Sequence, residues 1–176
     1  MSNVVKTALE STIQGLKENP TQAQTVFETR SVLGEGTSVK STARQFEFHF
    51  DEPAALGGKD EAPNPVEYAL ASLGACQAIV YRALASLKGI SLTHVEVKTT
   101  GHLNLEGFLG LDEEVRPGLG KVEFETLVVS EEPQEKIERL AKQVEALCPV
   151  LDIIQNPVKV SGKLTIHKPA DALLDA

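Results

Sequence analysis

The sequence is poor in the residues that usually build a metal centre or a disulfide-bonded scaffold. It contains two cysteines, Cys76 and Cys148, four scattered histidines and no CxxC pair. Zinc sites in proteins need a dense cysteine and histidine spacing that is missing here. We therefore expect no metal and no cofactor. In a reducing cytoplasm, two cysteines far apart in the chain are more often free thiols or a transient redox pair than a structural disulfide.

Positive charge is also scarce, and long apolar runs are missing. The chain has 17 Lys and Arg against 25 Asp and Glu, a net charge of -8 and a pI near 5.0. Nucleic-acid binding depends on cations that neutralise phosphates, so a nucleic-acid partner is disfavoured. No run approaches the roughly 20 apolar residues of a membrane span, and the first 19 residues lack a signal-peptide core. We expect a cytoplasmic protein without a membrane partner.

Length and composition are those of one globular domain with additions at its ends. The 176 residues are 41% hydrophobic, which is enough for one core and too short for a second full domain. We expect a helical extension at residues 1–24, a single domain at residues 25–168 and a loose tail at residues 169–176.

The longest apolar periodic stretch covers residues 64–89. Its apolar side chains recur at steps of three and four, which predicts a helix with Cys76 on the buried stripe. Asn64 is a good N-cap and Pro65 a good first residue, while Gly89 is a typical stop. The opposite side is hardly polar, so we expect this helix to be surrounded on most sides.

The flanking segments predict a mixed α+β domain. Before the helix lie an amphipathic helix at residues 2–18, strands at residues 25–33 and 37–50, and an irregular loop at residues 51–63. After it, the pattern predicts a long hairpin of residues 93–105 and 120–130, then a helix at residues 133–147 and a last strand at residues 158–167. Pro149 interrupts the second helix and predicts a short helix that begins just after Cys148.

The two thiols have different predicted surroundings. Cys148 at a helix N-terminus would be helped toward the thiolate by the helix dipole. Cys76 on an apolar stripe would have its pKa raised by desolvation and would need a cation from another element to react. A buried structural cysteine is the simpler interpretation of Cys76 as long as the two residues are not known to meet.

The chain contains the segments DEPAALGGKDEAPNPVEYALASLGAC at residues 51–76 and ALCPV at residues 146–150. Together these two segments resemble the OsmC/Ohr family. The resemblance covers residues 25–167, and it leaves the N-terminal helix as an addition. It implies antiparallel sheets around a long buried central helix, in an intertwined homodimer with two active sites at the subunit interface.

The resemblance also implies an antioxidant function in oxidative stress. In the peroxidase members, a thiolate on the central helix reduces an organic hydroperoxide and becomes a sulfenic acid. A second cysteine then forms a disulfide, which a dithiol reductant reopens. By this resemblance Cys76 is the peroxidatic cysteine and Cys148 the resolving one.

The family places an arginine and a glutamate beside the thiolate. Arg44 matches the arginine, with Arg30 in reserve. Peroxidase members carry the glutamate directly after the proline, where this chain has Val66, so Glu67 is the candidate carboxylate. An unbroken helix would separate Glu67 from Cys76 by about 13 Å and half a revolution, so a contact requires a break, for example near Gly74. The alternative is that Glu67 only stabilises the first helical turn.

Two other functions fit the sequence. One is a dimeric OsmC-like protein that binds a small apolar ligand or senses redox state without catalysis, which Val66 favours. The other is a structural domain whose helix at residues 2–18 recruits a partner.

Overall fold

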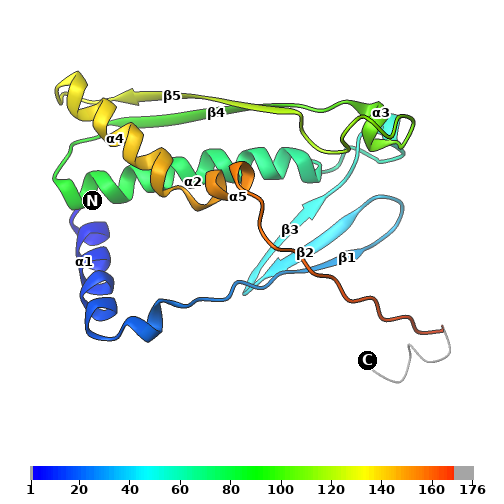
Figure 1. Ribbon diagram of the computed structural model, residues 1–176, viewed down its shortest axis with the longest axis horizontal. Helices are drawn as coiled ribbons and strands as arrows, with labels where there is room; N and C mark the ends of the chain where they lie inside the picture. The colour runs from blue at the N-terminus through cyan, green and yellow to red at the C-terminus, as the bar shows by residue number, and fades with distance from the viewer. Residues whose placement is uncertain (1, 169–176) are drawn as a thin grey trace.

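A helix of 24 residues, α2 (Pro65–Lys88), runs through the middle of the computed structural model, which describes residues 2–168 (Figure 1). The tail predicted at residues 169–176 lies outside the described part. The Asn64 side chain accepts from the Glu67 backbone N–H at 2.9 Å, and the Glu67 carboxylate accepts from the Asn64 N–H at 2.8 Å. This reciprocal cap begins α2, and Gly89 ends it. The predicted helix at residues 64–89 is confirmed.

A long antiparallel hairpin lies along α2. It consists of β4 (His94–His102) and β5 (Lys121–Val129), paired from His94 opposite Val129 to His102 opposite Lys121. The Thr99 hydroxyl donates to the Leu70 carbonyl of α2 at 3.1 Å. At Gly74 a Cβ would lie only 3.3 Å from the Val97 carbonyl, so a glycine lets helix and strand approach. Gly74 is thus a packing position in an unbroken helix.

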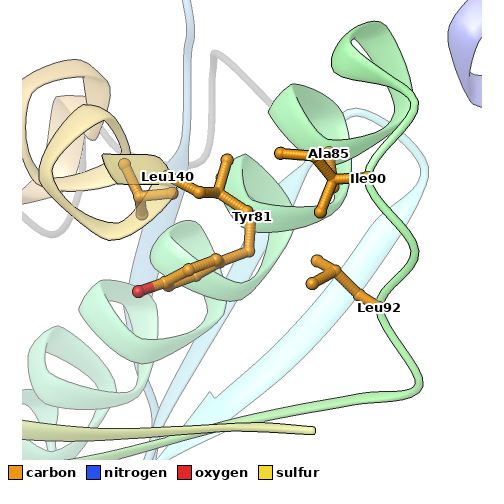
Figure 2. Packing of buried hydrophobic residues seen from close by; sticks show 6 residues of the cluster. Tyr81, Ala85, Ile90, Leu92 and Leu140 are labelled. Carbon is orange, nitrogen blue, oxygen red and sulfur yellow. The ribbon is translucent and has the colours of Figure 1, made fainter. Parts of the chain in front are cut away.

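Two helices at the end of the domain pack on α2 as well. These are α4 (Gln134–Leu147) and α5 (Pro149–Gln155), separated by Cys148 as the Pro149 signal predicted. Figure 2 shows the larger core cluster between α2, α4 and the segment that enters β4, formed by Tyr81, Ala85, Ile90, Leu92, Leu140 and Val144. A second cluster contains Leu73, Cys148 and Leu151. Burial of these side chains stabilises the body of the domain, at about 1.5–3 kcal/mol for each large one.

The N-terminal part contains a helix and a small sheet. Helix α1 (Ser2–Glu18) agrees with its prediction, and a 3-10 turn, η1 (Pro20–Ala23), follows. The sheet has the order β1 (Arg30–Leu33), β2 (Val39–Ala43), β3 (Phe46–Phe50), all antiparallel. The single strand predicted at residues 37–50 is wrong, because the chain reverses at Arg44, which adopts a left-handed φ of 55°.

This sheet touches the body at few points. Phe48 and Phe50 of β3 pack against Tyr68 in the first turns of α2, with ring centroids 6.0 and 4.3 Å from the tyrosine ring. Other apolar residues of the N-terminal region stay exposed, among them Val26 and Phe27 at 93% and 91%. In a single chain the sheet is therefore attached mainly at one end.

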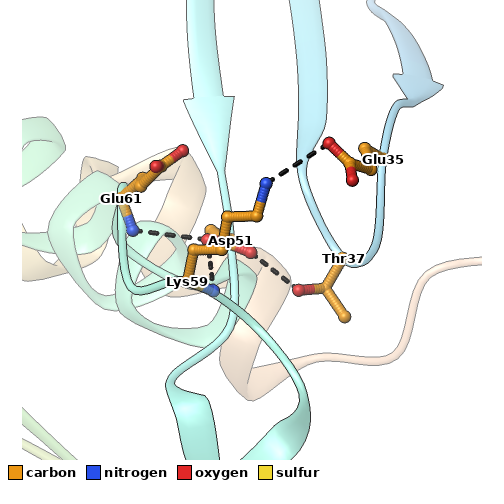
Figure 3. A network of polar contacts seen from close by, with 5 residues as sticks. All are labelled: Glu35, Thr37, Asp51, Lys59 and Glu61. Atoms are coloured by element: carbon orange, nitrogen blue, oxygen red, sulfur yellow. Dashed lines mark hydrogen bonds and ion pairs between the residues drawn. The ribbon is translucent and has the colours of Figure 1, made fainter.

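The loop that connects β3 to α2 is organised by a buried carboxylate, Asp51 (Figure 3). It accepts from the Thr37 hydroxyl at 2.7 Å and from the backbone N–H groups of Lys59 and Glu61 at 2.9 and 3.3 Å. These hydrogen bonds, led by that of Thr37, lower the pKa of Asp51 from 3.8 to about 2. Gly58 is required in the same loop, because a Cβ there would collide with the Glu52 carbonyl.

Three further expectations are corrected. Residues 158–167 form no strand, since no strand edge within residues 2–168 pairs with them and the backbone of a strand needs such a partner. The connection in the hairpin contains a short helix, α3 (Leu105–Phe108), that was not predicted. The loop before α2 contains a 3-10 turn, η2 (Ala54–Leu56), that was not predicted either.

The helix α2 was expected to be surrounded on most sides, but its outer side is exposed in the single chain. The exposed residues there are Ala71, Ser72, Ala75 and Ile79.

By length and composition alone, α2 could cross a membrane, with a mean hydropathy of 1.3 over 18 residues. The expectation that no segment reaches this level was therefore wrong. The hairpin, α4, α5 and α1 all pack on α2, which is the situation of a core helix in a globular domain.

Candidate functional site

The two cysteines, distant in sequence, meet in the structure. The Sγ atoms of Cys76 and Cys148 are 3.3 Å apart, and both residues are free thiols. A disulfide requires a separation of about 2.05 Å, so a small movement of the two side chains would join them. The pair can thus alternate between a dithiol and a disulfide.

Packing of two antiparallel helices brings the thiols together. Tyr81 of α2 packs against Leu140 and Val144 of α4, and Leu73, two turns earlier on α2, packs against Cys148, one turn beyond Val144. Cys76 lies one turn from Leu73 and contacts the same small cluster. Its predicted place on the packed stripe is thus confirmed, but Cys76 is half-buried instead of fully buried.

Cys148 is the deeply buried member of the pair, with 1% of its surface exposed. It ends α4 and caps α5, accepting from the Leu151 N–H at 3.4 Å. Burial raises the pKa of Cys148, the neighbouring Cys76 sulfur adds to this, and the Leu151 N–H opposes it. The predicted break at Cys148 and the short helix α5 are present. The expectation that the helix N-terminus would favour the Cys148 thiolate is wrong, because desolvation raises the pKa more than the helix terminus lowers it.

This asymmetry gives the two thiols different chemical abilities. The Cys148 thiol donates a hydrogen bond toward the Cys76 sulfur, so the buried thiol points its proton at the more exposed sulfur. Cys76 is also the sulfur that a reactant can approach. A buried, protonated thiol beside a more accessible sulfur is suited to resolve an intermediate formed on that sulfur.

The two candidate arginines belong to the N-terminal sheet region and not to the helices that carry the thiols. Arg44 lies in the β2–β3 turn with its guanidinium 5.1 Å from the Phe46 ring centroid. Arg30 opens β1, where it is exposed. Within residues 2–168 no ion pair of either arginine is found. Their roles beside the thiolate stay predictions.

Glu67 has the structural role that was given above as the alternative to a catalytic one: it stabilises the first turn of α2. Its carboxylate closes the cap at the start of α2, and α2 continues unbroken from there past Cys76. The helix break that a contact with the thiol required is thus not found. Val66, at the usual glutamate position, is half-buried. A catalytic role for Glu67 stays a prediction without support from one subunit.

One polar residue next to the site was missed by the sequence analysis. Gln77 follows Cys76 directly, is 1% exposed, and has no hydrogen-bond partner for either side-chain polar atom within the described residues. An unpaired buried amide costs about 1–3 kcal/mol of stability. The sequence did contain a signal for Gln77, because it places a carboxamide one turn after Leu73 and one turn before Tyr81 on an otherwise apolar stripe.

The sequence matches one known family. A family model described as OsmC-like protein covers residues 58–163, which includes both cysteines and Gln77. Among curated proteins, none matches the chain.

Solved structures share the fold at low identity. An OsmC-like protein from Mycoplasma pneumoniae superposes with a TM-score of 0.67 and 19% identity, covering 76% of this chain and 90% of that one. An organic hydroperoxide resistance protein OsmC from Legionella pneumophila gives 0.58 and 19%, covering 75% and 90%. Another organic hydroperoxide resistance protein, from Elizabethkingia anophelis, gives 0.56 and 17%, covering 76% and 91%.

Proposed function

Because the chain belongs to the OsmC-like protein family, we propose that it is a cysteine-based peroxidase that reduces organic hydroperoxides. The observation that carries the proposal is the 3.3 Å separation of the Cys76 and Cys148 sulfurs. The names of two structural neighbours as organic hydroperoxide resistance proteins support the choice of substrate. So does the apolar wall beside Cys76, which includes Leu73, Val122 and Phe124.

The reaction proceeds in three balanced steps. The Cys76 thiolate attacks one peroxide oxygen, the O–O bond breaks, and the alcohol leaves with a proton while Cys76 becomes a sulfenic acid. The Cys148 sulfur then attacks the Cys76 sulfur, the S–O bond breaks, and water leaves with the Cys148 proton. A dithiol reductant supplies two electrons and two protons to reopen the disulfide.

We further propose that the working form is a homodimer. The supporting observations are apolar surfaces that one chain leaves uncovered: the outer side of α2 at Ile79, and Val26, Phe27 and Leu33 beside the sheet. The segment after α5 exposes Val160, Leu164 and Ile166 at 80–84%. Exposed apolar surface on this scale is typical of an interface. In such a dimer the sheet of one subunit could bring Arg44, or Arg30, to the thiols of the other.

The decisive experiment follows consumption of an alkyl hydroperoxide with a dithiol reductant in stopped flow. We expect turnover by the native protein, none above the uncatalysed rate for Cys76→Ser, and a single oxidation without a disulfide for Cys148→Ser. Equal rates for the native protein and Cys76→Ser would refute the peroxidase.

A second function is supported by the site of a single subunit. Within residues 2–168 neither Arg44 nor Arg30 forms an ion pair, and Glu67 is engaged in the helix cap. An OsmC-like dimer that binds a small apolar ligand would need neither a cation nor a carboxylate beside Cys76. In that case Cys76 would react slowly with alkylating reagents near neutral pH and would not change in the presence of peroxide.

A further inference from the structure

The side chain of Gln77 is the most unusual polar group in the core. It is 1% exposed, and neither its Nε2 nor its Oε1 has a partner within the described part of the chain. Buried amides in native proteins are nearly always paired, and an exception calls for an explanation such as a water, an ion or a catalytic role. Gln77 therefore needs a partner that no other group within residues 2–168 supplies in the resting dithiol state.

The position of Gln77 limits what this partner can be. Leu73, Gln77 and Tyr81 are one helical turn apart on the same stripe of α2. Since Leu73 packs against Cys148 and Tyr81 packs against Val144, Gln77 lies opposite the turn of α4 that ends at Cys148. Cys76 and Gln77 both lie within one turn of Leu73 on α2 and flank it on either side, with their side chains about 100° apart around the helix.

We propose that Gln77 is a further catalytic residue, whose Nε2 donates a hydrogen bond to the oxygen that Cys76 acquires as a sulfenic acid. The inference rests on the proposed function, because only a reaction with peroxide places an oxygen there. In the dithiol state this oxygen does not exist, which explains why the amide has no partner. In the sulfenic state the hydrogen bond holds the oxygen and leaves the Cys76 sulfur open to Cys148.

The step that Gln77 assists is disulfide formation. The Cys148 sulfur forms a bond to the Cys76 sulfur, the S–O bond of the sulfenic acid breaks, and the departing hydroxide takes the Cys148 proton to become water. Gln77 gives up no proton in this step. It stabilises the negative charge that develops on the departing oxygen, as a preorganised amide donor does in other sites.

The test substitutes Gln77→Met, which keeps the shape and removes both polar atoms. Quenched-flow mass spectrometry after one equivalent of alkyl hydroperoxide measures two rates, the oxidation of Cys76 and the closure of the disulfide. We expect closure to slow by about tenfold or more, with the sulfenic acid trapped by dimedone, while oxidation changes less than closure does.

The matched control is Ser86→Ala. Ser86 is the other residue of α2 with a buried, unpaired polar atom, and it lies more than two turns beyond Gln77. Both variants remove an unpaired group and should unfold at a temperature equal to or above that of the native protein, but Ser86→Ala should leave both rates unchanged. If Gln77→Met unfolds at a higher temperature with native closure rates, Gln77 is only a tolerated defect and the inference is wrong.

A second measurement does not depend on Gln77→Met folding. In Cys148→Ser the sulfenic acid persists, so the NMR resonances of the Gln77 side-chain amide can be compared before and after one equivalent of hydroperoxide. A downfield amide proton shift supports the hydrogen bond, and no change refutes it. If Cys76 does not react with hydroperoxide even in the native protein, the proposed function itself fails, which the oxidation rate shows separately.

Discussion

The body around α2 and the N-terminal sheet bury different kinds of residue. All of the buried hydrophobic side chains of the described structure lie between Leu73 and Leu151, in the body. The sheet region buries only polar groups, Ser41 and Asp51, which are hydrogen-bonded to Ser31 and Thr37. The body is thus held by apolar burial within one chain, whereas the sheet is held by its own hydrogen bonds and a few aromatic contacts.

The exposed apolar residues of the sheet mark the region that a second subunit of the proposed homodimer would cover. A three-stranded sheet with exposed apolar residues is marginally stable without a packing partner. The thiol pair lies in the self-sufficient body, while the arginines that could activate it lie in the sheet. The dithiol chemistry should therefore survive in one subunit, and its acceleration should depend on assembly.

The largest effect is expected for Leu73→Ala, in the body. Leu73 is fully buried between the thiols and Leu151, so its truncation should lower the free energy of unfolding by about 2–5 kcal/mol. Urea denaturation monitored by circular dichroism measures this value. The same substitution in the sheet, Leu33→Ala, is the control, and in dilute protein it should cost less than about 0.5 kcal/mol. Equal losses would abolish the contrast between the two regions.

An intermediate effect is expected for Arg44→Gln, in the sheet. If Arg44 of one subunit reaches Cys76 of the other, its removal takes a cation away from the thiol and should slow alkylation at neutral pH by about tenfold. Iodoacetamide kinetics against pH measure this change, with the reserve candidate Arg30→Gln measured in parallel and Arg139→Gln, at an exposed ion pair of α4, as the control. Light scattering should give a mass of twice 18.9 kDa. Native alkylation kinetics in Arg44→Gln would exclude this arginine.

The smallest effect on global stability is expected from the titration of Asp51. Its folded-state pKa lies below the unfolded value, so its contribution is present above pH 3.8 and is lost as the pH falls toward about 2. The N–H groups of Lys59 and Glu61 should then exchange faster in hydrogen-exchange NMR, before the body unfolds. Thr37→Val removes the largest cause of the low pKa and should move this loosening to higher pH. A loop unaffected by acid would contradict the role of Asp51.

Local signals were sufficient where the chain itself supplies every partner. Asn64, Pro65 and Gly89 set the limits of α2, because a helix end needs only neighbouring groups to satisfy its free N–H and C=O groups. Pro149 likewise broke α4 and started α5. The strand at residues 158–167 failed for the opposite reason, since a strand needs a partner edge that sequence periodicity does not specify.

The two cysteines of the candidate site were predictable from the sequence, but their electrostatic surroundings were not. The sequence contexts of Cys76 and Cys148 pointed to the pair through family resemblance. The pKa of Cys148, however, is raised, whereas its place at a helix N-terminus predicted a lower pKa. Gln77 was overlooked because one carboxamide hardly changes an apolar stripe. Whether such a group is paired depends on side chains from other elements.

The sequence by itself determined the limits of the helices and of the long hairpin, and that two thiols occur in specific local contexts, because caps, prolines and periodicity act over a few residues. Only the tertiary structure decided that Cys76 and Cys148 lie 3.3 Å apart, that Cys148 is the buried thiol and that Gln77 has no partner within residues 2–168. These properties depend on the antiparallel packing of α4 on α2. This packing sets the distance between residues remote in the chain and decides which of them lose contact with water.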